Sequence, residues 1–220
     1  MTIRPKESLE EILRACAALH ARLCPRQVLG ARMGLLAGRL LGMDVPRRDK
    51  RLLVIVEADG CAVDGIATAA GCSVGRRTLR VEDFGKVAAT FVDVRTAQAV
   101  RIVPRGEARA LARKHAPEAR NRWEAQLIAY QRMPDERLLR WEWVRLTMPL
   151  KAIIGQPGTR AECEVCGEEI INGREVMRAG RMLCRTCAGQ AYYQPTGLED
   201  CSLAAMGQMS GLESLGVMRV

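Results

Sequence analysis

Aromatic side chains are scarce in this chain of 220 residues, where Phe, Trp and Tyr together make up 4%. Proteins that bind single-stranded nucleic acid without sequence preference stack bases on aromatic side chains, so the composition argues against that function. No run of about 18 apolar residues occurs, which predicts that no helix spans a membrane. Residues 1–11 hold no apolar run of the secretory type. Cysteine-rich runs that ligate iron–sulfur clusters are also missing.

The remaining composition is that of an ordinary globular protein, 48% hydrophobic and 27% charged. The formal net charge is +9, and a basic balance permits contact with nucleic acid or another polyanion. However, the arginines are spread along the chain and interleaved with acidic residues. Nucleic-acid binding is therefore the weaker interpretation of the charge.

Four cysteines in two CxxC pairs, Cys163 with Cys166 and Cys184 with Cys187, are the strongest chemical signal. Seventeen residues separate the pairs, within the interval typical of a four-cysteine zinc site. A structural zinc ion takes four such soft ligands in a tetrahedron and no water. Two disulfides, or a redox CxxC motif, are the alternatives. Metal-type cysteine spacing without an export signal predicts a reducing, cytoplasmic environment.

The element order predicts an α+β fold, with helices packed on a mixed β-sheet and a small zinc-ribbon domain after it. We expect a core domain over 1–152, the ribbon over 153–194 and a loosely ordered tail over 195–220. A segment as short as the ribbon buries too little apolar surface to fold without a staple such as a metal ion. Residues 155–158, Gly-Gln-Pro-Gly, have the composition of a linker.

Hydrophobic periodicity and breaker residues predict the elements of the core. Ser8 and Glu11 have the spacing of a capping box at the first helix, and Pro25 suits the first turn of the second. Glycines recur every fourth residue along that second helix, which predicts close packing against another element. One parallel crossover is implied, from strand 52–56 through helix 61–70. The expected helices cover 7–23, 25–40, 61–70, 107–114 and 118–131, and the expected strands 52–56, 78–81, 86–94, 98–103 and 138–148.

A second group of candidate ligands lies in the core domain. His20 and Cys24 are four residues apart, and Cys24 precedes Pro25 at the N-cap of a helix, where a thiol has a depressed pKa. Cys61 follows strand 52–56 at another helix start. Turns of this kind gather at one edge of a sheet, so the three side chains could meet there and hold a metal ion. Free cysteines that only fill space are the alternative. Further candidates for the same pocket are Asp64, Cys72, Arg76 and Lys86.

Five segments resemble the motifs of one known family, the FmdE family of formylmethanofuran dehydrogenase. The resemblance covers about residues 15–190, including a four-cysteine ribbon of the kind that many members append. The segments are 20–25 (HARLCP), 29–34 (LGARMG), 56–66 (VEADGCAVDGI), 71–75 (GCSVG) and 83–86 (DFGK).

The resemblance implies an α+β core in which helices and a mixed sheet form a metal-binding pocket, with His20, Cys24 and Cys61 at the family's ligand positions. It also implies a homodimer. Arg22 stands where the family usually has a second histidine, and Arg26 where it has a glycine. An arginine stays protonated and cannot ligate a metal.

Three functions remain open at this point. The first is a metal-binding accessory protein that holds a transition metal in the core pocket and docks a protein partner through the zinc ribbon. The second is a small metal-dependent enzyme, with Asp64 or Glu57 as proton acceptor and Lys86 or Arg76 holding an anionic substrate. The third is a nucleic-acid-binding or regulatory module built on the ribbon, whose basic side would carry Arg174, Arg178, Arg181 and Arg185. No self-sufficient redox catalyst is expected, because the chain lacks iron–sulfur ligand runs.

Overall fold

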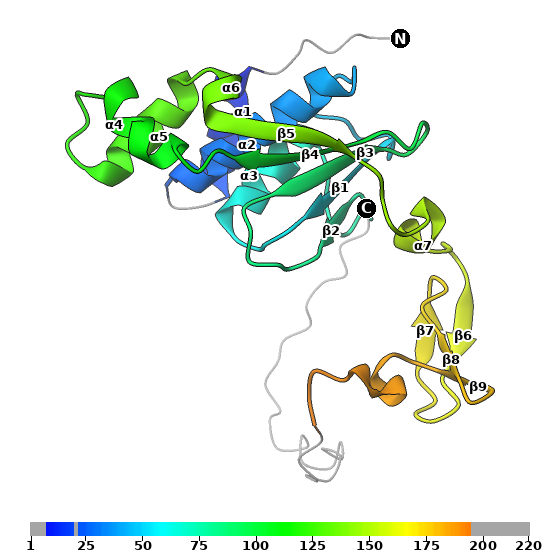
Figure 1. Cartoon of the computed structure of the whole chain (residues 1–220). Coiled ribbons are helices and arrows are strands. Elements are labelled where there is room, and N and C mark those ends of the chain that lie inside the picture. Colours follow the sequence, from blue (N-terminus) through cyan, green and yellow to red (C-terminus); the bar gives the residue numbers. More distant parts are fainter. Residues whose placement is uncertain (1–7, 20–21, 195–220) are drawn as a thin grey trace, which may run out of the picture. The chain divides into compact units, whose positions relative to one another are not determined.

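The computed structural model describes residues 8–19 and 22–194, and divides the chain into a first unit that ends at Ile154 and a second that begins at Gly155. Each unit is described by itself (Figure 1). Among the described residues, no helix is both long and apolar enough to cross a membrane. The first unit contains α1 (Leu9–Ala18), α2 (Pro25–Leu40), β1 (Leu52–Val56), α3 (Cys61–Ala70), β2 (Leu79–Val81), β3 (Ala89–Asp93), β4 (Ala99–Pro104), α4 (Ala108–His115), α5 (Arg122–Arg132), α6 (Asp135–Leu138), β5 (Leu139–Val144) and α7 (Leu150–Ile154).

The strands of the first unit form one mixed sheet in the order β2-β1-β3-β4-β5. Strands β1 and β2 are parallel and are joined through α3, while the other neighbours pair antiparallel. The predicted single crossover and the predicted α+β class are thus confirmed. Strand β1 lies inside the sheet, which agrees with its unbroken apolar sequence.

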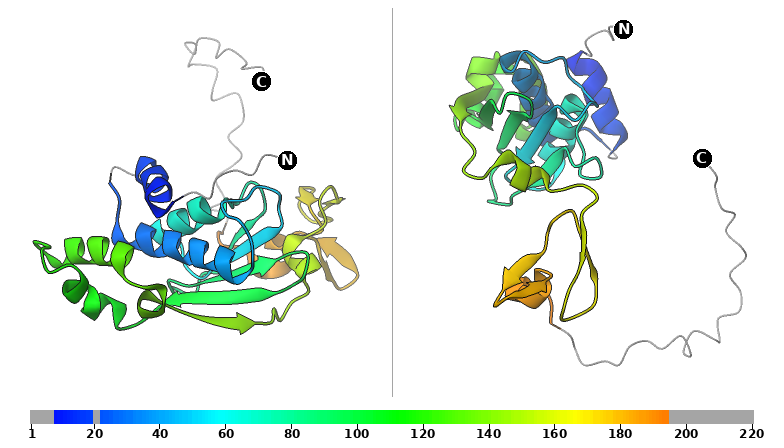
Figure 2. Two further views of the ribbon diagram at one scale, coloured as in Figure 1. Left: turned by 90° about the horizontal axis from the view of Figure 1, so that it is seen from above. Right: turned by 90° about the vertical axis from the view of Figure 1, so that its right-hand side faces the viewer.

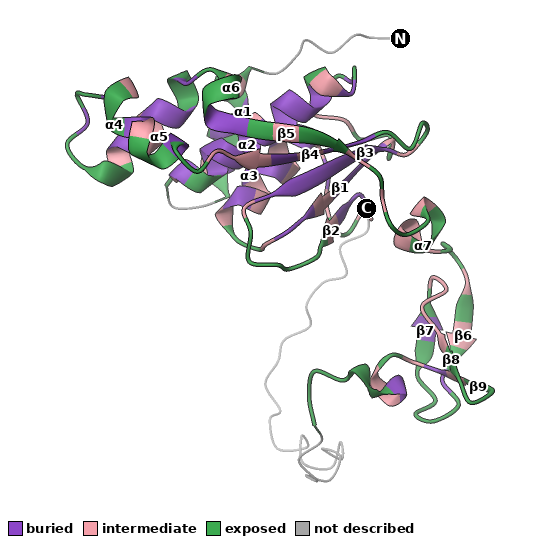
Figure 3. Ribbon diagram, in the orientation of Figure 1, coloured by how far each residue is buried: buried purple, intermediate pink, exposed green. Residues whose placement is uncertain are grey.

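One face of the sheet carries α1, α2 and α3 (Figure 2). Helix α2 is the centre of this layer, and most of its residues are buried (Figure 3). It crosses α3 at very short range: a Cβ on Gly30 would lie 2.0 Å from the Ala62 carbonyl oxygen, and a Cβ on Gly65 would lie 2.1 Å from that of Gln27. The glycine repeat is therefore used for helix packing within the chain, as predicted.

The other face of the sheet is covered in part by α7, a short helix that the sequence did not suggest. Leu53, Val92 and Ala99 are buried there, and Leu150 and Ile153 of α7 pack against them. Strand β5 ends at Val144, four residues earlier than predicted, which leaves the chain free to turn toward α7.

Helix α1 begins as expected. The Glu11 amide donates to Ser8 Oγ at 3.2 Å and the Ser8 amide to Glu11 Oε2 at 2.7 Å, which completes the predicted capping box. The helix ends at Ala18, five residues before the predicted end. Helix α2 starts at Pro25, whose missing N–H is harmless in a first turn.

The second unit is built from two short hairpins and a helical turn. Strands β6 and β7 pair antiparallel, as do β8 and β9, and the helical turn follows β9. Only four residues form its buried core: Cys163, Ile170, Leu183 and Ala188. The elements are β6 (Arg160–Glu162), β7 (Glu169–Ile171), β8 (Val176–Arg178), β9 (Arg181–Leu183) and the turn η1 (Thr186–Gln190).

Candidate metal centres and the core cavity

The four ribbon cysteines converge in the second unit. One CxxC pair lies in the turn between β6 and β7 and the other follows β9, and all four sulfur atoms lie within 4.8 Å of one another. The Sγ atoms of Cys166 and Cys184 are 3.9 Å apart. Zinc–sulfur bonds of about 2.3 Å in a tetrahedron separate the sulfurs by about 3.8 Å, so the donor set has the size and chemistry of a four-thiolate metal centre.

Backbone amides point at these sulfurs. The Cys184 amide donates to Cys163 Sγ at 3.2 Å, and the Cys187 amide donates to Cys184 Sγ at 3.3 Å. Hydrogen bonds from the amides of Cys166 and Cys184 lower the pKa of the Cys163 thiol to about 6. A hydrogen bond with Cys184 raises the pKa of Cys187 to about 12. The site therefore stabilises negative sulfur at its buried member, as a cation-binding centre requires.

The ribbon arginines are largely engaged inside the second unit. Arg178 donates to the Ala188 carbonyl at 2.8 Å, and Arg181 donates to the Glu164 carbonyl at 3.0 Å. Arg160 pairs with Glu169 at 2.6 Å. The basic side chains thus stabilise the fold of this unit and are partly neutralised within it.

In the first unit, the start of α2 meets the start of α3. Cys24 is the N-cap of α2 and Cys61 is the first residue of α3, and both are partly exposed. A hydrogen bond with the Cys24 thiol, together with burial, raises the pKa of Cys61. The two thiols therefore lie in direct contact. His20, the third predicted ligand, lies outside the described residues, so its imidazole is not placed.

A buried glutamine holds this corner together. Gln27 is fully buried, accepts a hydrogen bond from the Cys24 amide at 2.9 Å and donates to the Cys16 carbonyl at 3.1 Å. It thereby ties the end of α1 to the start of α2. The Cys16 thiol is itself buried, which raises its pKa, and contacts Thr68 of α3.

The other pocket candidates divide into two groups. Asp64 lies one turn after Cys61 on α3, and its charge contributes to raising the pKa of Cys61. Cys72 lies beyond the far end of α3, about 15 Å away for ten residues of helix, and burial raises its pKa to about 12. Arg76 is also beyond that end, where its guanidinium donates to the Arg48 carbonyl. The structure therefore does not bring Cys72 and Arg76 to the paired thiols.

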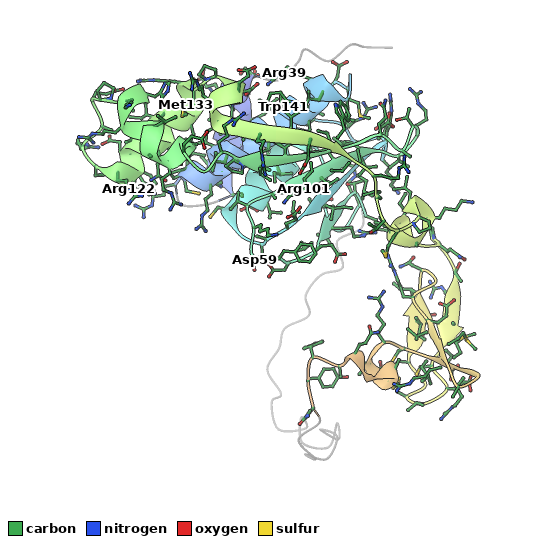
Figure 4. All side chains as sticks on the ribbon, in the orientation of Figure 1. Arg39, Asp59, Arg101, Arg122, Met133 and Trp141 are labelled. Atoms are coloured by element: carbon green, nitrogen blue, oxygen red, sulfur yellow. The ribbon has the colours of Figure 1, made fainter. Side chains whose placement is uncertain are left out.

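Glu57 and Lys86 form a separate feature at the end of β1. Glu57 is buried and accepts two hydrogen bonds from Arg101 of β4, at 2.6 and 2.7 Å (Arg101 is labelled in Figure 4). This ion pair lowers the pKa of Glu57, so the carboxylate is a poor proton acceptor near neutral pH. Lys86 is exposed, and its amide donates to the Glu57 carbonyl at 3.0 Å.

Among the described residues, the ribbon cysteines are the one group of three or more His, Cys, Asp or Glu side chains close enough to share a metal ion. Cys24 and Cys61 supply two soft donors, which is half of a tetrahedral set. A metal ion at the core corner therefore needs at least one further ligand, and His20 is the residue that the sequence offers.

A cavity of about 560 Å³ adjoins Cys24. It lies where the start of α2, the end of β4, the start of α4 and one side of α5 come together. Its lining is Cys24, Pro25, Arg26, Leu29, Val87, Pro104, Arg105, Gly106, Ala108, Arg109, Trp123, Gln126 and Tyr130.

Sequence reasoning did not identify this cavity, because α4 and α5 are positioned by contacts that span about a hundred residues. Arg32 of α2 donates to the carbonyls of Tyr130 at 2.8 Å and Met133 at 2.7 Å, and to the Asp135 carboxylate at 2.6 Å. An arginine within an apolar helix was the available signal, since a buried guanidinium needs partners. Those partners fix α5 beside α2.

Comparison with known proteins gives three findings. The family model described as "FmdE, Molybdenum formylmethanofuran dehydrogenase operon" matches residues 19–140. A protein of Archaeoglobus fulgidus, named a probable S-adenosyl-L-methionine-binding protein, is 31% identical over 88% of this chain and 56% of its own length. This chain thus spans about half of that relative. The crystal structure of an FmdE-like protein of tungsten formylmethanofuran dehydrogenase, from Syntrophus aciditrophicus, covers 88% of this chain and all of its own, with a TM-score of 0.56 and 20% identity.

Proposed function

Because this chain belongs to the FmdE family, we propose that it is a metal-binding accessory protein with two metal centres. One is a structural zinc ion held by Cys163, Cys166, Cys184 and Cys187. The other is a transition metal ion held at the core corner by Cys24 and Cys61, with His20 as the third ligand. The contact between the thiols of Cys24 and Cys61, which lie 37 positions apart in the sequence, is the observation that carries the second centre.

The chemistry of the donors decides which ions suit the two centres. Four thiolates favour zinc, and its role in the second unit is to replace the apolar core that four buried residues cannot supply. Two thiolates and an imidazole suit zinc, nickel or copper, and three protein ligands leave a position open for exchange. Both core thiols are partly exposed, which gives an ion a route to them.

Metal counting tests this proposal. The protein is stripped with a chelator, reloaded with zinc, passed through a desalting column and analysed for metal. We expect two equivalents in the wild type and one in Cys24→Ser, Cys61→Ser and His20→Ala. Cys72→Ala removes a thiol from the same unit but should keep both equivalents. One equivalent in the wild type, lost completely in Cys166→Ser, would reject the core centre.

We propose that the ribbon docks a protein partner rather than nucleic acid. Its arginines are engaged within the unit, whereas several large apolar side chains point to solvent. Ile171 is 51% exposed and Met177 62% exposed. Exposed apolar side chains in a small domain are typical of interaction surfaces. If nucleic acid is instead the partner, duplex DNA should bind with an affinity that falls steeply as salt is raised.

We also propose that the protein is a homodimer of the cytoplasm. Strand β5 is an edge of the sheet, and its Trp143 is 56% exposed. An uncovered edge strand with a large apolar side chain is a natural pairing surface. The glycine stripe of α2 gives no support to a dimer, because α3 and Val45 occupy it. Light scattering should give about twice the mass of one chain, and Trp143→Arg should reduce it to one.

The name of the Archaeoglobus relative raises S-adenosylmethionine as a ligand. That molecule carries one carboxylate, one ammonium and one sulfonium group, and is therefore a net cation. The cavity lining contains three arginines and, among the described residues, no carboxylate. Its charge thus disfavours this ligand, and we expect saturating S-adenosylmethionine to leave the thermal stability unchanged.

A further inference from the structure

We propose that the cavity beside Cys24 is a binding site for a small organic anion, with a phosphate or carboxylate group on an apolar or ring-bearing body. This inference is independent of a metal ion at Cys24, because none of its contacts passes through the metal ligands. It rests on the charge, the apolar walls and the volume of the cavity.

The charge of the cavity is the first observation. Arg26, Arg105 and Arg109 line it, and no acidic side chain does so in the part of the chain that the structure describes. Arg105 has only a long, exposed ion pair with Glu107, at 3.8 Å. Within residues 8–19 and 22–194, no carboxylate pairs with Arg26 or Arg109. Three guanidinium groups around one hollow repel one another, and an anion between them removes that repulsion.

The arginines elsewhere in the first unit show the contrast. Arg101 forms its bidentate pair with Glu57, and Arg51 forms one with Asp93, at 3.0 and 2.7 Å. These pairs connect strands and stabilise the fold. The guanidinium groups at the cavity have no such partner, which suits them to a carboxylate or phosphate from outside, because the arginine fork matches both groups.

A buried tyrosine orients one of these arginines. Tyr130 is 4% exposed, and its hydroxyl oxygen accepts a hydrogen bond from Arg109. Burial raises the pKa of Tyr130, so the hydroxyl keeps its proton and can itself donate to a bound anion. Gln126, on the same side of α5, adds a further amide donor to the lining.

The walls of the cavity determine the body of the ligand. Leu29, Pro104 and Trp123 give the lining an apolar part, and Trp123 is 43% exposed. The Arg22 guanidinium lies over the Trp123 ring, 5.5 Å from its centroid, and brings a fourth positive charge to that wall. A volume of about 560 Å³ is within the range of about 300–1,000 Å³ that small-molecule sites occupy. An inorganic ion alone would leave most of it unfilled.

Isothermal titration of the full chain with four probes tests the inference. Phenyl phosphate and phenylacetate carry both a charge and a ring, and distinguish a phosphate from a carboxylate ligand. Inorganic phosphate has no ring, and benzyl alcohol has no charge. The titrations use a phosphate-free buffer of low salt, since screening weakens such contacts. Quenching of tryptophan fluorescence, compared between the wild type and Trp123→Phe, reports whether the probe enters this cavity.

We expect saturable binding of phenyl phosphate or phenylacetate, at least about 10-fold tighter than that of inorganic phosphate and of benzyl alcohol. Arg26→Gln and Arg109→Gln should each weaken it by roughly 10- to 100-fold, as expected when one charged hydrogen-bonding group is lost. Both side chains are exposed, so the fold should survive. Arg140→Gln removes an exposed arginine that does not line the cavity and should change nothing. The same affinities should be found in Cys24→Ser.

Three results would overturn the inference. The first is no saturable binding of either ring-bearing anion to the folded wild type. The second is an equal affinity in the wild type and the two cavity variants. The third is inorganic phosphate binding as tightly as phenyl phosphate, which would indicate an adventitious ion only.

Discussion

The crossing of α2 and α3 determines where Cys24 and Cys61 lie, and it allows a sharp test by one methyl group. In Gly65→Ala, the new Cβ would lie 2.1 Å from the Gln27 carbonyl oxygen and 2.8 Å from the Ala31 amide nitrogen. Both neighbours are helix backbone, which cannot rotate away as a side chain can. The helices must therefore separate by about 1 Å before the contact is tolerable.

The expected loss of stability follows from this separation. Overpacking in a core costs about 1–3 kcal/mol, and more when the obstacle is backbone. A gap of that size also weakens the dispersion contacts along the rest of the crossing. Alanine favours a helix over glycine by about 1 kcal/mol, which offsets part of the loss. We expect Gly65→Ala to lower the free energy of unfolding by about 2–4 kcal/mol, and the Tm of a domain of this size by roughly 4–16 °C.

Chemical denaturation followed by circular dichroism measures this loss. Gly75→Ala is the matched control: a Cβ there has no atom within 4 Å and the residue has no positive φ, so the change should lie within about 0.5 kcal/mol. Gly65→Ala should also reduce metal binding at the core corner, since the two helix starts move apart. A Gly65→Ala protein as stable as the wild type would refute the packing described for α2 and α3.

Three further predictions concern ionisable groups of the first unit. Glu57→Gln leaves Arg101 without its partner and should destabilise the protein by about 3 kcal/mol in urea denaturation, whereas an effect below about 1 kcal/mol would mean that water replaces the pair. The pair with Arg51 holds the pKa of Asp93 well below its ordinary range, so its contribution to stability should be constant above about pH 5 and decline below about pH 4, where the unfolded carboxylate takes up protons. Denaturation curves of Asp93→Asn should lack this part of the acid decline, and an unchanged pH profile would contradict it. Cys72, with its pKa raised to about 12 by burial, should resist iodoacetamide at pH 8 until the protein unfolds, as mass spectrometry of the labelled peptides would show.

Local rules were sufficient for most elements of the first unit. Strand β1 and helix α3 have the bounds expected from an apolar run and from a glycine stop, since Gly71 adopts the left-handed conformation that ends the helix. The FmdE resemblance is confirmed by the family model and by the fold of the Syntrophus protein. These successes depend on signals that lie within a few residues of each other.

The remaining features depend on contacts that no short segment encodes. The buried role of Gln27 follows from a hydrogen bond to a carbonyl on another helix. The cavity exists only because Arg32 binds carbonyls about a hundred residues away. Arg22 was predicted to be useless as a metal ligand, and its contact with Trp123 gives it a different place at the cavity wall. Cys72 was assigned to the pocket by sequence proximity, although the length of α3 separates it from Cys61.

The central claim is that Cys24 and Cys61 hold a metal ion apart from the one in the ribbon. Anomalous diffraction at the zinc edge, from crystals of the zinc-loaded full chain, tests it most directly. The account predicts two peaks: one among the four ribbon sulfurs, and one about 2.3 Å from the Sγ atoms of both Cys24 and Cys61. A single peak at the ribbon, with the two core thiols in contact and no density between them and His20, would contradict it.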